Sequence, residues 1–170
     1  ANRVGMTMVS YNGYLYALGG TSDGTATNAA STVWIAKLGV NGEPQLWHPT
    51  DSNKNNWVYW YSSNNTLPAA VYYTSAVAYK NKLYLVGGRN SSGNSVNTVH
   101  SADLLPTGDI GVWSAANMQA LPEANGRHSH SVHIYNDVMY VLGGITTTGG
   151  GSSNTLLNTV YYSKLSSTGA

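Results

Sequence analysis

The sequence predicts an all-β fold made of three copies of one antiparallel unit, and three observations support this prediction. A tyrosine, a short polar turn, an apolar run and a glycine pair recur three times in the same order. Each apolar run is four to five residues long, which suits a strand covered on both faces and is too short for a helix. The first turn is Asn-Gly, the pair that most favours a two-residue hairpin. The copies are Tyr11 to Gly20, Tyr79 to Gly88 and Tyr135 to Gly144.

The first copy belongs to a unit that we place at residues 1–47. The glycine pair ends its apolar run, because glycine tolerates a positive φ and lets another backbone come close. A polar loop follows at residues 21–31, and a second Asn-Gly turn stands at residues 41–42. We therefore expect four strands, at residues 3–10, 15–18, 32–38 and 45–47.

Residues 48–66 interrupt the repeat. Polar stretches enclose an aromatic segment that contains Trp57, Tyr59, Trp60 and Tyr61. The repeat resumes at Leu67-Pro68, since Leu-Pro also precedes the third copy at residues 121–122. We predict a protruding insertion on the same face as the long loops.

The second and third units follow at residues 67–113 and 121–170. In the second unit we expect strands at 71–79, 83–86 and 96–103 and an outer strand marked by Trp113. In the third unit we expect strands at 127–135, 138–142 and 159–165, a mobile loop at 145–158 and no outer strand. The apolar runs predict a buried core that contains Leu15, Leu18, Leu83, Val86, Met139 and Leu142.

Composition narrows the functional classes. Charged residues make up 9% of the chain and the net charge is +1, so we expect no nucleic-acid partner. The absence of cysteine excludes disulfides and thiol chemistry. No apolar run reaches the length of a membrane helix, so we expect no membrane span. Low charge with many Asn, Ser, Thr, Gly and Tyr residues favours an extracellular or cell-surface location.

The glycine pairs, the tyrosine before each and a tryptophan about 25 to 28 residues later resemble the kelch repeat. The segments Asn97-Thr-Val, Gly108 to Trp113 and Arg127-His-Ser-His look most like kelch-like repeats of bacterial secreted or surface proteins. The resemblance covers all but residues 48–66. It implies a kelch-type β-propeller segment of three four-stranded antiparallel blades, the third lacking its outer strand. It also implies one face built by the long loops, at residues 21–31, 48–70, 89–97, 114–127 and 145–158.

Six residues are candidates for binding a ligand or partner. Trp57, Tyr59, Trp60 and Tyr61 could stack on sugar rings or anchor a protein, or instead pack on the propeller. Arg3 and Arg127 stand eight residues before Tyr11 and Tyr135. They could hold an acidic ligand in a bidentate manner, or instead bond carbonyl groups of a neighbouring loop.

His128 and His130 are the weak candidates for a metal site. They share one face of a strand while His133 points the other way, so at most two could reach one ion. The alternative is that His130 is hydrogen-bonded inside the blade. We expect no metal and no cofactor. Asn64 and Asn90 match the glycosylation pattern, which matters only in a secretory host.

Two functions remain open. The first is a non-enzymatic extracellular binding, adhesion or assembly module that uses the long-loop face to bind a protein or glycan. The second is a carbohydrate-active enzyme, because some kelch relatives are enzymes, such as galactose oxidase and sialic acid mutarotase. The oxidase needs a cysteine-crosslinked tyrosine, which this chain lacks because it has no cysteine. The enzyme hypothesis is therefore a mutarotase or glycosidase with its site at the propeller mouth.

Counting strands predicts that the chain is not self-sufficient. Three blades cannot close a ring, since propellers have about four to eight. We expect further blades from a longer parent chain or from another copy. Two copies could make a closed six-bladed ring, and head-to-tail contacts could make a filament.

Overall fold

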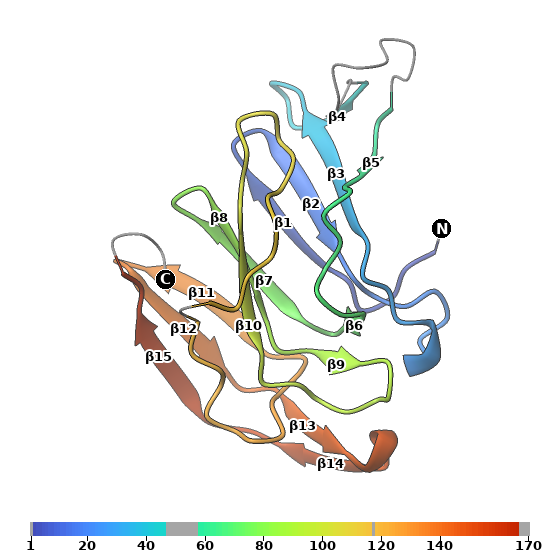
Figure 1. The fold of residues 1–170 in the computed structure, drawn as a ribbon, viewed down its shortest axis with the longest axis vertical. Helices are drawn as coiled ribbons and strands as arrows, with labels where there is room; N and C mark the ends of the chain where they lie inside the picture. Colours follow the sequence, from blue (N-terminus) through green and yellow to red (C-terminus); the bar gives the residue numbers. More distant parts are fainter. Residues whose placement is uncertain (1, 47–57, 117, 167–170) are drawn as a thin grey trace.

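The computed structural model describes residues 2–46, 58–116 and 118–166. Among these residues are five antiparallel sheets, and the three larger ones follow one another along the chain and lie side by side, as Figure 1 shows. The strands nearest the N-terminus of each blade contact one another, β1 with β7 and β7 with β11. This arrangement confirms the prediction of an all-β segment built from repeated blades.

Blade one is a five-stranded sheet in which the order is β1-β2-β3-β4 and β5 also pairs with β3. The turn between β1 and β2 has positive φ at Asn12 and Gly13, 46° and 77°. A two-residue hairpin of this kind needs positive φ at both positions. The strands are β1 (Thr7–Tyr11), β2 (Tyr14–Leu18), β3 (Val33–Leu38), β4 (Pro44–Gln45) and β5 (Tyr61–Ser62).

The outer strand of blade one corrects the predicted boundary of the insertion. Lys37 and Leu38 of β3 pair with β4, and Trp34 and Ile35 pair with β5. The edge of one sheet is therefore shared by two segments that lie 15 residues apart in the sequence. The insertion enters from within the outer strand and not from a connection between blades, because Tyr61 and Ser62 return to the same edge.

Blade two contains β7 (Ser75–Tyr79), β8 (Lys82–Val86) and β10 (Val99–Asp103). Its outer strand consists of two isolated antiparallel bridges beside β10, one between Leu104 and Ile110 and one between Ser101 and Ser114. The predicted strand 71–79 is broken at Tyr73, where φ is 51°. The part before the break, β6 (Val71–Tyr72), pairs instead with β9 (Arg89–Asn90) in a separate small sheet.

Blade three contains β11 (Ser131–Tyr135), β12 (Val138–Leu142) and β15 (Val160–Lys164). Within the described residues β15 is the edge of this sheet, in keeping with the missing outer strand. The predicted mobile loop is instead a hairpin of β13 (Ile145–Thr148) and β14 (Ser153–Leu156), joined by the 3-10 turn η2 (Gly149–Gly151). A second 3-10 turn, η1 (Ala26–Asn28), lies in the loop after blade one's glycine pair.

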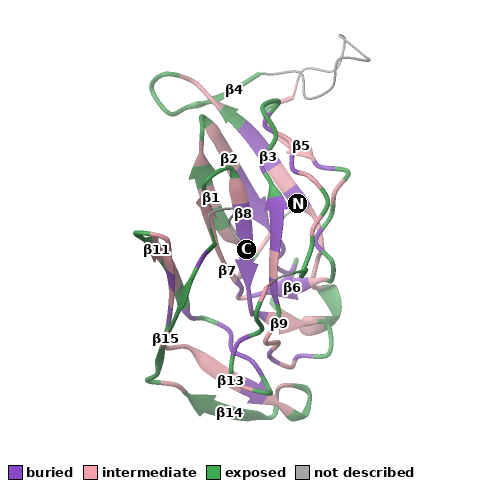
Figure 2. Ribbon diagram, turned by 60° about the vertical axis from the view of Figure 1, so that its left-hand side comes forward, coloured by how far each residue is buried: buried purple, intermediate pink, exposed green. Residues whose placement is uncertain are grey.

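The core lies between the blades in two clusters, one between blades one and two and one between blades two and three. Figure 2 shows the buried positions concentrated on the strands that face a neighbouring blade. Leu18, Leu83, Val86 and Met139 are buried, as predicted.

The core prediction is wrong at two positions. Leu15 is half-buried and Leu142 is exposed. Leu15 has the place in blade one that Leu83 has in blade two, where Leu83 faces the preceding blade. Leu142 faces away from blade two. Both leucines point to sides on which no blade packs in the described part of the chain.

The glycine pairs explain how neighbouring blades come together. The Gly20 amide donates to the Val71 carbonyl and the Gly88 amide to the Arg127 carbonyl, each at 2.8 Å. A Cβ on Gly87 would lie 2.4 Å from the Arg127 carbonyl oxygen. The recurring glycines are therefore required because the next blade's backbone occupies the space of a side chain.

Candidate functional site

The aromatic segment of the insertion is only partly within the described residues. Trp57 lies outside them. Tyr59 is 53% exposed, whereas Trp60 and Tyr61 are half-buried. The Tyr61 hydroxyl donates to Asp109 Oδ2 at 3.5 Å, and burial together with the charge of Asp109 raises the pKa of Tyr61. Of the described aromatic residues of the insertion, Tyr59 presents the most exposed surface to a ligand.

The end of the insertion is fastened to blade two through Asp109. Ser63 Oγ donates to Asp109 Oδ1 at 2.6 Å, and the amide of Ile110 donates to the same oxygen at 2.8 Å. Asn65 Nδ2 donates to the Ile110 carbonyl at 2.7 Å. The flank of the insertion thus joins blades one and two, which corrects the picture of a segment that only protrudes.

Arg127 has a structural position that contradicts its predicted role in ligand binding. Its side chain is 0% exposed. It forms an ion pair with Glu123 and donates to the Gly143 carbonyl and to Thr159 Oγ1, each at 2.8 Å. Burial alone would raise the pKa of Glu123, but the hydrogen bonds and charge of Arg127 bring it below its usual value. The guanidinium has no surface left for an external ligand.

Arg3 takes the corresponding position in blade one. Its Nη2 donates to Thr32 Oγ1 at 2.9 Å, as Arg127 does to Thr159. Thr32 and Thr159 correspond to each other, because each carbonyl accepts the amide of the first glycine of its blade's pair. The aligned arginines therefore tie the start of a blade to its third strand, which is the structural alternative stated above.

His128 is held by hydrogen bonds, whereas both ring nitrogens of His130 are buried without a hydrogen-bond partner, so the expected hydrogen bonding of His130 inside the blade is wrong. His128 Nε2 lies 2.8 Å from Thr147 Oγ1 and its Nδ1 lies 2.9 Å from Ser129 Oγ. Burial lowers the pKa of both His128 and His130 to about 4, with further lowering from nearby arginine charge. No group of three or more His, Cys, Asp or Glu residues that could hold a metal is found among the described residues.

Five of the seven acidic residues make contacts that stabilise the fold. Asp137 pairs with Lys80 at 2.5 Å and Asp103 with Lys82 at 2.7 Å. The other three are Asp23 with Asn28, Asp109 with Ser63 and Glu123 with Arg127. The mutarotase or glycosidase hypothesis, which needs an acid and a base that converge, stays a prediction.

The structure gathers apolar side chains at a place that sequence reasoning missed. We call it the open face of blade three and define it as Tyr140, Leu142, Val160 and Tyr162, on the side of β12 and β15 away from blade two. Leu142 is 41% exposed and Tyr162 is 76% exposed. The rings of Tyr140 and Tyr162 form a tilted pair 6.4 Å apart. Exposed aromatic residues beside aliphatic ones are typical of a protein contact surface.

The open face corresponds to surfaces that are buried in the other blades. By strand register, Leu142 takes the place of Leu18 in blade one and Val86 in blade two. Both counterparts are 0% exposed because the following blade covers them. The signal was present in the sequence, since the repeat aligns these positions, but it required knowing which side of each strand faces the next blade.

Comparisons with known proteins agree with this architecture. The model of the Kelch motif matches residues 70–101, from the end of the insertion's flank to the third strand of blade two. A solved structure of YjhT is similar with a TM-score of 0.58 and 14% identity, covering 95% of this chain. This chain spans 46% of YjhT's length. A search of the curated proteins found no match.

The structural likeness bears on the fold alone at this identity. Altogether 156 chains of solved structures match, so the architecture is widely shared and does not select one activity. No helix among the described residues is long and apolar enough to cross a membrane. The repeated blades, the motif match and the structural likeness together identify the fold as a segment of a kelch-type β-propeller.

Proposed function

We propose that this chain is a non-enzymatic protein-binding and assembly module, in which blade three binds a further blade of the same kind. The observation that carries the proposal is the open face of blade three. It presents to solvent the positions that blades one and two bury against their next neighbour. The open face has the composition of a blade contact surface, and no blade covers it among the described residues.

Hydrogen-bonding groups at the edge of this face support the same partner. The Tyr73 amide donates to the Gly5 carbonyl at 2.7 Å, and the Ser129 amide donates to the Tyr73 carbonyl at 2.9 Å. These three residues correspond to one another in the repeat, so a fourth blade would donate to the Ser129 carbonyl. The backbone thus offers the partner a bond of the kind that already joins the first three blades.

Space at the third glycine pair supports it as well. A Cβ on Gly143 would have as its nearest neighbour the Leu157 carbonyl oxygen at 3.6 Å, within the same blade. Its counterparts Gly19 and Gly87 would each place a Cβ 2.4 Å from a carbonyl of the following blade. The space beside Gly143 could therefore accept the backbone of a further blade, as the spaces beside Gly19 and Gly87 do.

The wider role that we propose is binding or adhesion at the cell surface or outside the cell. Its support is the low charge and the abundance of small polar residues. Tyr59 and the strand β14 provide exposed surface for a protein or glycan ligand. A structural neighbour of about twice this length supports the view that three blades operate within a larger ring.

The test is the association state of the 170-residue chain, measured by light scattering after size-exclusion chromatography over a range of concentrations. Self-association is expected, since blade one of a second copy is an available blade of the same kind. Tyr162→Asp should shift the chain toward the monomer, because it places a charge in the open face. Val40→Asp, at a fully exposed turn position, is the matched control and should change nothing. A folded, monodisperse monomer at all concentrations would overturn the proposal.

A further inference from the structure

A small hollow of about 230 Å³ lies between blades one and two, at the end of the strands where the two-residue turns are. The glycine pairs and the long loops are at the opposite end, because β2 and β8 each run from a turn to a glycine pair. The volume is below the roughly 300–1,000 Å³ of sites for drug-sized ligands, so the hollow suits one ring-sized group. Its lining residues are Tyr11, Asn12, Tyr14, Tyr16, Asn81 and the segment 104–106.

The three tyrosines come from one face of the hairpin of β1 and β2. Tyr11 stands directly opposite Tyr14 in the strand register, and Tyr16 follows two residues later on the same side of β2. The rings of Tyr14 and Tyr16 are 6.5 Å apart and tilted by 45°. The alternation of the two strands therefore gathers three aromatic rings on one wall of the hollow.

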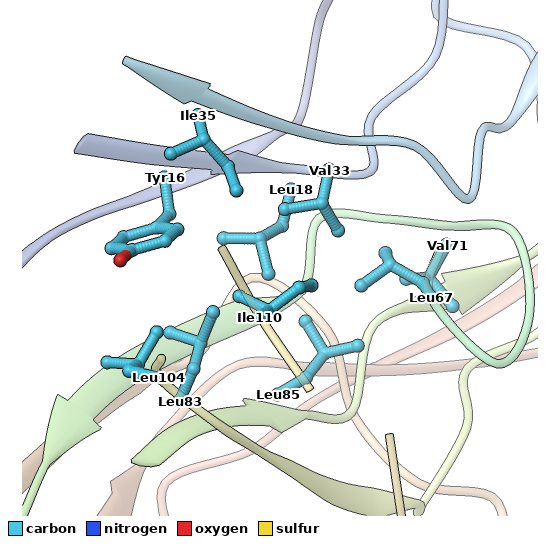
Figure 3. Close-up of a cluster of buried hydrophobic side chains, with 10 residues drawn as sticks. All are labelled: Tyr16, Leu18, Val33, Ile35, Leu67, Val71, Leu83, Leu85, Leu104 and Ile110. Atoms are coloured by element: carbon cyan, nitrogen blue, oxygen red, sulfur yellow. The ribbon is translucent and has the colours of Figure 1, made fainter. Parts of the chain in front are cut away.

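The neighbouring turn of blade two holds two of these rings in place. Tyr16 is 1% exposed, and its hydroxyl donates to the Gly108 carbonyl at 3.0 Å. A Cβ on Gly108 would lie 2.1 Å from Cε1 of Tyr14, so the Tyr14 ring rests against the backbone of this turn. Figure 3 shows Tyr16 and Leu104, which both line the hollow, at the same end of the buried cluster. The aromatic wall is therefore held in place without a ligand, which lowers the entropy cost of binding one.

Two asparagine amides form the polar rim of the hollow. The Tyr11 hydroxyl donates to Asn81 Oδ1 at 3.2 Å and accepts the Asn81 backbone amide at 3.0 Å. Asn12 Nδ2 donates to the same Oδ1 at 3.4 Å. Both asparagines are exposed, and no partner of Asn81 Nδ2 or Asn12 Oδ1 is found among the described residues. The rim thus offers one donor and one acceptor on adjacent side chains, which two neighbouring hydroxyl groups can match.

The corresponding place between blades two and three is charged. The strand registers and turns align Asn12 with Lys80, Tyr14 with Lys82 and Asn81 with Asp137. Lys80 pairs with Asp137 at 2.5 Å, and Lys82 pairs with Asp103 at 2.7 Å. The bond from the tyrosine is retained, since the Tyr79 hydroxyl donates to Asp137 Oδ1 at 3.0 Å. The two places therefore share a geometry, but the three aligned positions are uncharged only between blades one and two.

We propose that the hollow binds one uncharged sugar ring of a glycan, stacked on the tyrosines and held through two neighbouring hydroxyl groups by the amides of Asn12 and Asn81. The CH groups of a pyranose carry partial positive charge, which favours the face of an aromatic ring. The lining residues are all uncharged, so a neutral sugar fits better than a sugar acid or an acidic peptide. A proline ring would fill the aromatic wall but would leave the amide donor and acceptor unpaired. The inference does not rest on the proposed function, because the open face belongs to blade three.

The experiment is saturation-transfer difference NMR on the 170-residue chain with the methyl glycosides of glucose, galactose and mannose. We expect saturation of the ring protons of at least one glycoside, with a Kd of about 1–10 mM, as suits one small uncharged ligand. Asn12→Lys combined with Asn81→Asp installs the ion pair already present between blades two and three, and it should weaken binding about tenfold or more. Asn81→Gly keeps the positive φ of the turn, as Gly13 does in blade one, and should weaken binding about threefold to tenfold.

Urea unfolding checks that both variants keep the fold. Tyr162→Asp in the open face is the control, since it should change association and leave sugar binding unchanged, so that failure of either proposal can be told from failure of the other. Absence of saturation transfer to all three glycosides at about 50 mM, or unchanged binding by both asparagine variants, would overturn the inference. Tighter binding of methyl glucuronide or of a pentaproline peptide than of every neutral glycoside would overturn the assignment of the ligand class.

Discussion

Ile110→Ala is the substitution that most directly tests how the blades are held together. The side chain is fully buried in the cluster between blades one and two, and its loss removes three carbon groups from contact with both blades. Transfer alone accounts for about 2.4 kcal/mol. The surrounding side chains stand on paired strands that cannot close over the gap, so a cavity contribution adds to this. We expect a total loss of about 3–5 kcal/mol in the free energy of unfolding.

Urea unfolding followed by circular dichroism measures this loss. With a slope of about 2 kcal/mol per molar urea, the midpoint should fall by about 1.5–2.5 M while the slope stays unchanged. Val112→Ala, two residues along the same strand and 81% exposed, is the matched control and should shift stability by less than about 0.5 kcal/mol. A loss below about 1 kcal/mol for Ile110→Ala would show that this side chain does not fill the cluster between blades one and two that Figure 3 draws.

Three further predictions concern the blade contacts and the buried charges. Gly87→Ala should cost about 1–3 kcal/mol more than Gly143→Ala in urea unfolding, because both positions have a positive φ but only the first meets a neighbouring backbone. Arg127→Met should lower the free energy of unfolding by about 3–5 kcal/mol, since it leaves a partly buried carboxylate unpaired. Acidification should also destabilise the chain through His128 and His130, whose pKa values of about 4 lie below the ordinary 6.5. On acidification the unfolded chain binds these protons at a higher pH than the folded chain does. The stabilisation is therefore fully present above about pH 6.5, and the free energy of unfolding falls by up to about 3 kcal/mol per histidine as the pH drops toward 4. Urea unfolding curves recorded across this pH range measure the change.

Each of these predictions has a control within the chain. Equal losses at the two glycines would contradict the close approach of blades two and three. For the arginine, the double variant that also carries Glu123→Gln should recover part of the loss, because it removes the unpaired charge. For the pH profile, His133→Gln at an exposed position should leave the acid limb unchanged, whereas a profile that is flat between about pH 7 and 4 would contradict the burial of the two histidines.

The sequence was sufficient to predict the centre of each blade because the signals there are local. A two-residue turn, an apolar run and a glycine pair determine β2, β8 and β12 together with their registers, and Val138 to Leu142 matches β12 at both ends. The outer edges were harder to predict because they depend on pairing between distant segments. Tyr61 and Ser62 return to the edge of β3 across the insertion, and no local pattern marks that return.

The candidate site differed from prediction for a related reason. Arg127 was judged from its place near the start of a strand, which says that it is on one face but not what that face meets. In the fold, Glu123 and two other groups surround it, so the residue that was a candidate for binding a ligand is the largest of the fully buried side chains among the described residues. The sequence pattern predicts which residues share one face of a strand. Whether that face is buried depends on how the neighbouring blades pack against it.

The repeat makes it possible to separate the effect of a residue from the effect of its surroundings. Val33, Val99 and Val160 are the same residue at the same register position of three successive blades, and their exposed fractions are 0%, 8% and 56%. Residue type cannot explain this difference, because it does not change. The cause must be the neighbour, which is present for the first two valines and not for the third. Val160 is an apolar residue at a position that is exposed to solvent in blade three and buried in the other two blades. This supports the proposal that the open face of blade three is a contact surface for a further blade.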